Sequence, residues 1–512
     1  LDDLPRASFL YEKANLFDRA IEAASGETER LAELHEKGGS LLKAAKHYES
    51  AGQYERAYAL YERTKYFKKA LDCYLKTANP RQGVLLHLYV KAGEPGQAIE
   101  WYLESGRLTD LEEALSLATT LGLVSYVEII EGRIAELASG NQGELKSYLA
   151  TAREDVLETY SQTIGIDFGT TNSVVAVFNK KTEKAEIVIS PNGSPYVPSF
   201  FCITKTHRFI FGEAARLRSL TTPHRVVARV KRSLGEERYF TIGHGSYRSE
   251  EVVASILRHL VSNAETYLQS KVETRFRDLV RQSELRFPAT MLDAFLNEQE
   301  ETEHVEDVVL SVPAYFNDNQ KRATRDSADI AGIRVRRLLH EPSAAALAYA
   351  HRRHYSGNLA VIDLGGGTLD ISIVEIGEGV SDVQNIGGDT KLGGSDIDAL
   401  MVDRVKADIK ERWDVDLERK KPELARLRYA CENLKIDLSS VTQATTTLPH
   451  FLNRPKYTFS LTRSELERLS RPILNRIRSI IRETIEEYES IIDNYILVGN
   501  ATKMPAFRDL VR

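Results

Sequence analysis

Two short segments of the chain carry residue types that could grip a phosphate group. Residues 165–173 contain Asp167 and residues 361–370 contain Asp363, and in both an apolar run ends in Asp before a Gly-rich turn with Thr. Glycines let backbone N–H groups approach phosphate oxygens, Thr hydroxyls can donate to them, and a carboxylate can hold the water shell of Mg²⁺. An apolar run resumes after each turn, which indicates strand, turn and strand. Two such turns predict two related lobes that hold one nucleotide from both sides.

Four other segments could complete this chemistry. Residues 308–318 indicate a strand that enters a Pro-braced loop, and residues 338–346 indicate a strand that ends at Glu341 before a helix with Pro in its first turn. A carboxylate at that place can orient a water molecule for in-line attack on a phosphate. Residues 387–396 form a further Gly-rich stretch, and residues 495–505 predict a strand and a Gly turn that could close over a nucleoside.

In this order and spacing, the segments resemble the ATPase domain of the heat shock protein 70 chaperone family, within the actin and sugar-kinase superfamily. The resemblance covers residues 163–512, and it is carried by the phrases Gly-Ile-Asp-Phe-Gly-Thr-Thr-Asn-Ser, Val-Pro-Ala-Tyr-Phe-Asn-Asp and Asp-Leu-Gly-Gly-Gly-Thr-Leu-Asp. It implies a two-lobed α/β actin-like ATPase domain, with lobe I at about 163–355 and lobe II at about 356–512. It further implies that the chain binds ATP or ADP with Mg²⁺ and hydrolyses ATP slowly.

The resemblance also implies a role for each matching residue. Catalysis would rest on Lys231, Glu341, Asp167, Asp363 and Thr368, and the two Asp residues would position Mg²⁺ through water. A cation at Lys231 would neutralise charge that develops on the transferred phosphoryl group. The nucleotide would be bound by Gly169, Thr170, Thr171, Asn172, Gly365, Gly366, Gly367, Gly393, Gly394, Asp396, Glu432, Lys435, Ser439, Gly499, Asn500 and Lys503. Coupling between the lobes would rest on Pro313, Lys321 and Arg337.

Several positions depart from the family pattern. Ile436 and Lys503 replace two Arg residues that stack on the faces of adenine, and residues 500–501 carry Asn-Ala in place of Gly-Ser. Ile offers only apolar contact and Lys a point charge, so we expect altered base recognition, at a cost of about 1 kcal/mol for a lost cation–π contact. Lys321 replaces an Arg used in lobe coupling, while Arg337 keeps the position that the family uses for a J-domain co-chaperone.

The length of the ATPase region also departs from the pattern. Residues 235–250 are shorter than usual, and residues 270–304 form an extra charged stretch with helical periodicity that we expect to rebuild this part of lobe I or to bind a partner. The chain begins at Leu1 without Met and ends at Arg512, short of the last family segment. We therefore expect a fragment whose ATPase domain is incomplete at its C-terminus.

A repeated pattern occupies residues 1–137. Tyr is followed by a small residue and later by Ala, and neighbouring copies start 13 residues apart at Tyr48, Tyr61 and Tyr74. Thirteen residues fit one short helix and a turn, and Gly52, Gly93 and Gly106 fall where turns are needed. The pattern resembles tetratricopeptide-like repeats and predicts an all-α solenoid that recruits protein partners. A non-repeating helical bundle is the alternative.

Residues 138–162 are expected to join the two parts as a helical linker. Residues 138–143 indicate a break, and residues 144–160 indicate a charged helix with one apolar face. The domain organisation predicted is therefore helical repeats at 1–137, the linker at 138–162 and the ATPase domain at 163–512.

The composition limits the classes of function. Hydrophobic residues make up 42% of the chain, charged residues 28%, and the net charge is −6, which gives no overall attraction to nucleic acid or to an anionic membrane. No apolar run is long enough to span a bilayer. Cys73, Cys202 and Cys431 are scattered, which favours a reducing, cytoplasmic location over a disulfide framework or a zinc site.

Three functions are compatible with these features. The first is a chaperone-type switch in which slow ATP hydrolysis controls a partner-binding helical module. The second is a nucleotide-binding scaffold with little or no hydrolysis, which the substitutions at Ile436 and residues 500–501 would favour. The third, a small-molecule kinase, is disfavoured because no acceptor-site Asp stands apart from the residues that position water.

Overall fold

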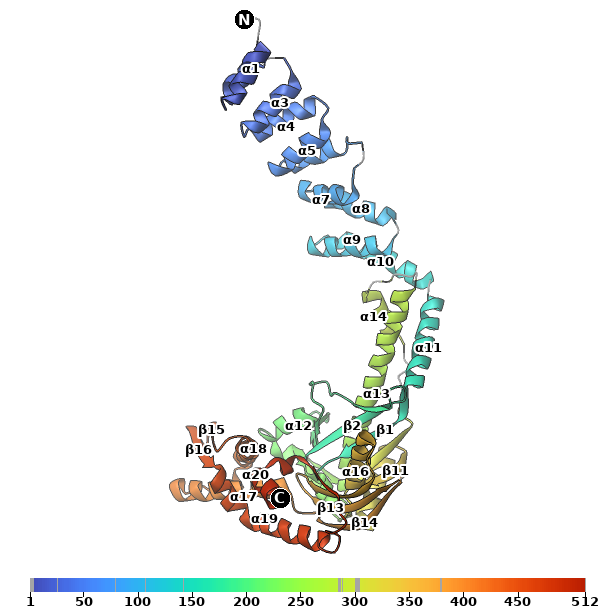
Figure 1. The fold of residues 1–512 in the computed structure, drawn as a ribbon, viewed down its shortest axis with the longest axis vertical. Coiled ribbons are helices and arrows are strands. Elements are labelled where there is room, and N and C mark those ends of the chain that lie inside the picture. The colour runs from blue at the N-terminus through green and yellow to red at the C-terminus, as the bar shows by residue number, and fades with distance from the viewer. Residues whose placement is uncertain are drawn as a thin grey trace. The chain divides into compact units, whose positions relative to one another are not determined.

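The structure, a computed structural model, describes residues 4–511 except 25, 79, 106, 141, 284–286, 288, 300–303 and 378–379, and it divides into two units (Figure 1). The helical unit contains Leu1–Ala150 and Phe276–Glu300, and the α/β unit contains Thr151–Arg275 and Glu301–Arg512. The prediction of a helical N-terminal region followed by a mixed α/β region is confirmed. None of the described helices has the length and apolar character that a membrane span requires.

Short helices follow one another through the helical unit. They are α1 (Leu4–Lys13), α2 (Phe17–Ala23), α3 (Thr28–Lys37), α4 (Leu41–Ser50), α5 (Tyr54–Arg63), α6 (Phe67–Tyr74), α7 (Gln82–Ala92), α8 (Pro95–Ser105), α9 (Leu108–Thr120), α10 (Val124–Gly140) and α14 (Ala289–Asn297). From α3 to α6, each helix begins 13 residues after the one before it. The spacing expected from the Tyr pattern is therefore the spacing of helices in this segment. Gly106 lies outside the described residues.

Buried tyrosines tie neighbouring helices of this segment together. Tyr48 and Tyr61 are each 1% exposed, and their hydroxyls donate to Glu36 at 2.9 Å and to Glu49 at 2.6 Å on the preceding helix. Buried alanines such as Ala57 let the helix backbones approach. The same contact at the same interval shows that one helix-to-helix interface recurs along α3–α5.

The turns between these helices share one left-handed conformation. Gly39, Gly52 and Lys65 occupy equivalent places with φ of 78°, 74° and 63°. A Cβ on Gly52 would meet nothing within 4 Å, so a substitution there tests the backbone conformation alone. We expect Gly52→Ala to lower the free energy of unfolding by about 1 kcal/mol and Lys65→Gly to raise it by up to about 1 kcal/mol. Urea unfolding followed by circular dichroism measures both, and destabilisation by Lys65→Gly would contradict the account.

Two larger sheets organise the α/β unit. The first has the order β11 (Val335–His340), β10 (Asp307–Val312), β1 (Tyr160–Phe168), β2 (Asn172–Asn179), β3 (Lys184–Ile187), with β4 (Val197–Pro198) on β2. The second has the order β14 (Val380–Asp389), β13 (Leu369–Gly377), β12 (Gly357–Leu364), β17 (Asn494–Val498). In both, an antiparallel hairpin has a parallel strand beside its first strand, namely β10 beside β1 and β17 beside β12. The two predicted phosphate turns are the turns of these two hairpins.

Smaller sheets and helices complete the α/β unit. The smaller strands are β5 (Phe200–Ile203), β6 (Phe209–Phe211), β7 (Val226–Ala228), β8 (Tyr239–Ile242), β9 (Gly245–Arg248), β15 (Gln443–Phe451) and β16 (Arg454–Thr462). The helices are α11 (Gln142–Thr159), α12 (Gly212–Ser219), η1 (Pro223–Arg225), η2 (Val230–Ser233), α13 (Ser249–Gln282), α15 (Asp318–Ile330), α16 (Glu341–Arg353), α17 (Gly394–Trp413), η3 (Leu417–Arg419), α18 (Lys421–Leu438), α19 (Arg463–Ile485), η4 (Asn500–Lys503) and α20 (Pro505–Val511). Two of them, α11 and α13, continue across the boundary between the units.

One buried apolar core supports the second hairpin from below. Ile362 and Leu364 of β12 pack with Ile397 and Met401 of α17 and with Leu434 of α18, and all five are at most 4% exposed. Residues 359–362 and Leu364 of β12 are buried because the strand lies inside the sheet and is covered by helices, which explains its run of apolar residues. The turn at its end is therefore fixed on a rigid base.

The segment expected to be a linker differs in detail from the prediction. Residues 138–140 continue α10, so the predicted break is wrong there, and residue 141 lies outside the described part. Helix α11 begins at Gln142 and ends at Thr159, and Tyr160 already belongs to β1, where it pairs with Asn179. The backbone of Tyr160 can hydrogen-bond either within the last turn of the helix or to the neighbouring strand. In the structure it pairs with the strand.

Most of the described residues of the extra stretch at 270–304 are helical. It comprises the end of α13 and α14, and residues 276–300 belong to the helical unit. The rings of Phe276 and Phe295 stack at 5.7 Å, Arg277 pairs with Asp293 at 2.5 Å, and α14 packs beside α10. This part of the stretch thus completes the helical unit.

Candidate functional site

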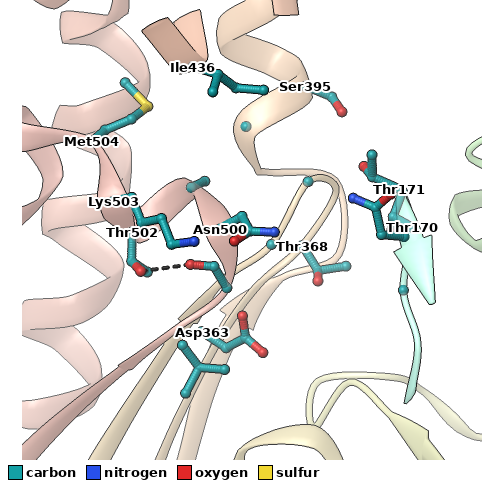
Figure 2. A pocket seen from close by; sticks show the side chains of 18 of the residues that line it. Thr170, Thr171, Asp363, Thr368, Ser395, Ile436, Asn500, Thr502, Lys503 and Met504 are labelled. Atoms are coloured by element: carbon teal, nitrogen blue, oxygen red, sulfur yellow. Dashed lines mark hydrogen bonds between the residues drawn. The ribbon is translucent and has the colours of Figure 1, made fainter. Parts of the chain in front are cut away.

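A cavity of about 1130 Å³ lies in the α/β unit between the two hairpin turns. Figure 2 shows Thr170 and Thr171 of the first turn facing Thr368 of the second, with Asp363 at the base. The predicted residues that line the cavity are Asp167, Gly169, Thr170, Thr171, Asn172, Lys231, Glu341, Asp363, Gly365, Gly366, Thr368, Gly394, Glu432, Lys435, Ser439, Gly499, Asn500 and Lys503. The chain therefore brings two sequence-distant turns and the segments between them around one space.

The first turn joins β1 to β2 and requires glycine at its start. A Cβ on Gly169 would lie 2.1 Å from the carbonyl oxygen of Asn172, so no side chain fits there. Ser199 donates to the Gly169 carbonyl at 2.7 Å, and the Ser199 N–H donates to the Thr171 carbonyl at 2.8 Å. The backbone is thus fixed from outside the cavity. The Thr171 hydroxyl is buried and has no hydrogen-bond partner among the described residues.

The second turn joins β12 to β13 and is fixed by the start of α17. The N–H groups of Gly394 and Ser395 donate to the carbonyls of Gly365 and Gly366 at 3.0 and 2.9 Å. A Cβ on Gly366 would lie 2.0 Å from the Thr171 hydroxyl oxygen. The two turns therefore approach each other so closely that glycine is the only residue that fits between them.

A buried ammonium and carboxyl group meet at the base of the cavity. Lys231 Nζ lies 2.6 Å from Glu341 Oε1, and the two side chains are 3% and 12% exposed. Lys231 comes from η2, where it lies over the rings of Phe168 and Phe316, and Glu341 is the first residue of α16. Asp167 accepts a hydrogen bond from Ser311 at 2.7 Å, which orients its carboxylate from the neighbouring strand β10.

Carboxyl groups outnumber cations at this place, and their pKa values reflect it. Burial raises the pKa of Glu341 to about 8, against the opposing charge of Lys231 and with the support of Asp167. Burial, together with Asp370 and Asp167, raises the pKa of Asp363 to about 7. Burial alone would lower the pKa of Lys231, but the neighbouring carboxylates outweigh it and the pKa rises. The single ammonium group of Lys231 therefore balances the charge of several carboxyl groups. A further cation would stabilise the ionised form of these carboxyl groups.

Asp370 is a member of the site that sequence reasoning missed. It is 1% exposed, it accepts a hydrogen bond from the Tyr315 N–H at 3.2 Å, and its second oxygen is buried without a hydrogen-bond partner among the described residues. Burial raises its pKa. Asp370 pairs directly with Asp363 across β12 and β13, and such pairs share a face of the sheet. The length of the turn would have been the signal, because it sets this register.

The far side of the cavity is less polar. Figure 2 shows Ile436 and Met504 on the side away from Asp363, and Ile436 is 56% exposed. Lys503 and Asn500 project from η4, which follows β17, and Gly499 before them has φ of 84°. Ile436 comes from α18, which also carries Glu432. This side has the shape and chemistry to hold a flat, partly apolar group.

Lys435 has a structural task beside the cavity. Its amine donates to the Gly394 carbonyl at 3.0 Å and lies 2.8 Å from a carboxylate oxygen of Asp398. Burial raises the pKa of Asp398, and Lys435 opposes the rise. Lys435 thereby ties α18 to the first turn of α17.

Three predicted nucleotide-binding residues do not line the cavity. Gly367 belongs to the second turn itself, and Gly393 and Asp396 belong to the start of α17, where Asp396 accepts a hydrogen bond from the Gly393 N–H at 2.8 Å. The residues predicted to couple the lobes also lie elsewhere. Pro313 follows β10, Lys321 lies in the first turn of α15, and the side chain of Arg337 on β11 is exposed.

The residues at the cavity fit a nucleotide with Mg²⁺. The Thr171 hydroxyl belongs to a residue that lines the cavity, and it is buried without a hydrogen-bond partner among the described residues. Buried polar groups are normally satisfied, so this hydroxyl indicates a polar ligand. Within the described ranges, no group of three or more His, Cys, Asp or Glu side chains is arranged as a direct metal site.

Comparison with protein families agrees with the geometry. Residues 163–512, more than half of the chain, match the family described as Hsp70 protein. This range begins within β1 and contains both hairpin turns, Lys231 and Glu341. The match supports a chaperone-type ATP-binding function for the α/β unit. The chain belongs to the Hsp70 protein family.

Proposed function

We propose that the α/β unit binds ATP with Mg²⁺ and hydrolyses it slowly, and that this cycle controls the binding of a protein partner by the helical unit. The observation that carries the proposal is the buried Lys231–Glu341 contact of 2.6 Å between the two glycine turns. A buried cation and a carboxyl group beside a phosphate cradle are the groups that in-line phosphoryl transfer to water requires.

Each residue has a task in this reaction. The N–H groups of the turns and the hydroxyls of Thr170, Thr171 and Thr368 would donate to phosphate oxygens. Lys231 would offset charge on the terminal phosphoryl group, and Glu341 would orient the attacking water and accept its proton as the bond to the departing ADP breaks. Mg²⁺, held through water by Asp167 and Asp363, would supply further charge neutralisation. The shared positive charge would also keep Glu341 ionised.

A titration and a rate measurement test this proposal together. Calorimetry with ATP and Mg²⁺ is expected to show binding, and single-turnover hydrolysis is expected to exceed the rate of ATP alone. Hydrogen exchange in the helical unit is expected to differ between the ATP and ADP states. An absence of ATP binding would refute the proposal.

The exposed Ile436 favours a second function for the same site. A side chain that is 56% exposed and apolar gives weak stacking for a base. Binding without hydrolysis above the uncatalysed rate would identify a nucleotide-responsive scaffold in place of an enzyme.

In either case, three buried and free cysteines support a reducing compartment such as the cytoplasm.

Binding of Mg²⁺ with the nucleotide is expected to release protons. Without metal, burial raises the pKa of Asp363 to about 7 and that of Glu341 to about 8, so at neutral pH Glu341 is mostly protonated and Asp363 is partly protonated. Because the pKa values of Asp363 and Glu341 are raised in the folded protein, protonation of these groups stabilises the folded state. This contribution to the free energy of unfolding is complete below their ordinary pKa values and is lost as the pH rises through 7 to 8. Bound Mg²⁺ favours the ionised form of both carboxyl groups. The affinity for Mg²⁺ and nucleotide should therefore fall as the pH falls from 8 to 6.

The proton release is measured by calorimetry in buffers of different ionisation enthalpy. The apparent binding enthalpy should depend on the buffer, and Asp363→Asn should reduce that dependence. An enthalpy that is the same in all buffers at pH 7 would contradict the shared-proton account of the carboxyl groups.

A further inference from the structure

Arg232 connects the two sides of the cavity. Its Nη1 and Nη2 atoms donate to Oδ1 and Oδ2 of Asp396 at 3.2 and 2.6 Å, and its Nε donates to the Gly367 carbonyl at 3.0 Å. The Arg232 side chain is 19% exposed and that of Asp396 is 30% exposed. All three contacts are made by one planar group, which is the geometry that a guanidinium provides and an ammonium does not.

Arg232 and its two partners lie on opposite sides of the cavity. Arg232 belongs to η2, which packs on the side of the first turn because Lys231 lies over the ring of Phe168. Gly367 is part of the second turn, and Asp396 lies in the first turn of α17, whose N–H groups fix that turn. Moving the two turns apart must therefore break three hydrogen bonds at once.

The same short helix also carries the cation of the site. Lys231 contacts Glu341 at the cavity, and its neighbour Arg232 contacts Gly367 of the second turn and Asp396 of α17. An ordered η2 thus places Lys231 and holds the second turn at the same time. Loss of the Arg232 contacts would therefore leave both Lys231 and the second turn less firmly held.

We propose that Arg232 is a positioning residue that latches the second turn against the first and sets the rate at which nucleotide leaves. This inference rests on the proposed nucleotide binding. Arg232 touches no reacting group, so its loss should change nucleotide release more than hydrolysis of nucleotide already bound. Asp396, expected from sequence to bind nucleotide, acts here as the anchor of the latch.

The test measures release of a fluorescent ADP analogue, chased with unlabelled ATP, from the full chain. Arg232→Gln and Asp396→Asn are each expected to speed release by about 10- to 100-fold, because each removes charge-assisted hydrogen bonds. The double variant should add little beyond either change, because both remove the same interaction. Asn can still accept from the Gly393 N–H, so Asp396→Asn keeps the cap of α17 and tests the latch even if Arg232→Gln folds poorly.

Two further variants separate the latch from simple charge. Lys at position 232 keeps the charge but cannot form the fork, so Arg232→Lys should also release nucleotide fast. Lys391 and Glu236 form a second ion pair at 2.8 Å, but both are exposed, so Lys391→Gln should change release less than about twofold.

The outcomes are distinct. Three results would each overturn the inference and leave nucleotide binding standing. They are a wild-type release rate in both Arg232→Gln and Asp396→Asn, a wild-type release rate in Arg232→Lys, and additive effects in the double variant. A wild-type protein that binds no nucleotide would overturn the proposed function and the latch with it.

Discussion

Replacing Lys231 by methionine is expected to slow single-turnover ATP hydrolysis by about a hundred- to a thousandfold. Lys231 is 3% exposed and lies 2.6 Å from Glu341, so its charge acts in a buried place with little screening by water. Methionine has a similar length and fills the same space, while the positive charge is lost. The phosphate turns remain, so ATP binding should fall much less than the rate.

The matched control is Lys205→Met, which removes a lysine that is exposed on the surface. It should leave both rate and affinity unchanged. Because loss of Lys231 leaves the buried Glu341 without its cation, the unfolding midpoint of the variant must be measured beside the rate. Equal hydrolysis rates for a folded Lys231→Met protein and the wild type would remove Lys231 from the mechanism.

Alanine at Gly367 is expected to weaken nucleotide binding by about ten- to a hundredfold, which corresponds to roughly 1–3 kcal/mol of overpacking. Its Cβ would lie 2.4 Å from Thr170 Cγ2 and 2.6 Å from the Thr170 hydroxyl oxygen. The two turns would have to separate, and the phosphate cradle would widen. Titration with ATP and Mg²⁺ measures the change.

Gly377→Ala is the control for this prediction. Gly377 ends β13, the strand that follows the turn containing Gly367, and a Cβ there would meet nothing within 4 Å. It should bind nucleotide as the wild type does. Undiminished affinity in Gly367→Ala would mean that the turns lie farther apart in the bound protein than they do here.

The sequence was most informative where chemistry forces a local pattern. Only glycine fits at Gly169 and Gly366, and each Gly-rich turn is flanked by two short apolar runs, so both hairpins could be predicted. The 13-residue interval of helices in the N-terminal region follows from local spacing as well. Its assignment to tetratricopeptide-like repeats remains a prediction.

Contacts between residues far apart in the sequence could not be predicted from local sequence patterns. Nothing in the letters around Arg232 indicates that it meets Asp396, because that contact depends on how two segments far apart in sequence pack. For the same reason, the contacts of Lys435 with Asp398 and Gly394 could not be predicted, although Lys435 lines the cavity as expected for a nucleotide-binding residue. Asp370 was visible in the second motif, but its burial beside Asp363 follows from strand register.

The two units of the chain are interleaved along the sequence, and this has a consequence for synthesis. The helical unit includes residues 276–300, which follow residues 151–275 of the α/β unit. Domains made first on the ribosome usually fold first. The contact between α10 and α14 can form only after residues 151–275 of the α/β unit have been translated. Helix α10 is thus translated before residues 151–275 but completes its packing only after them.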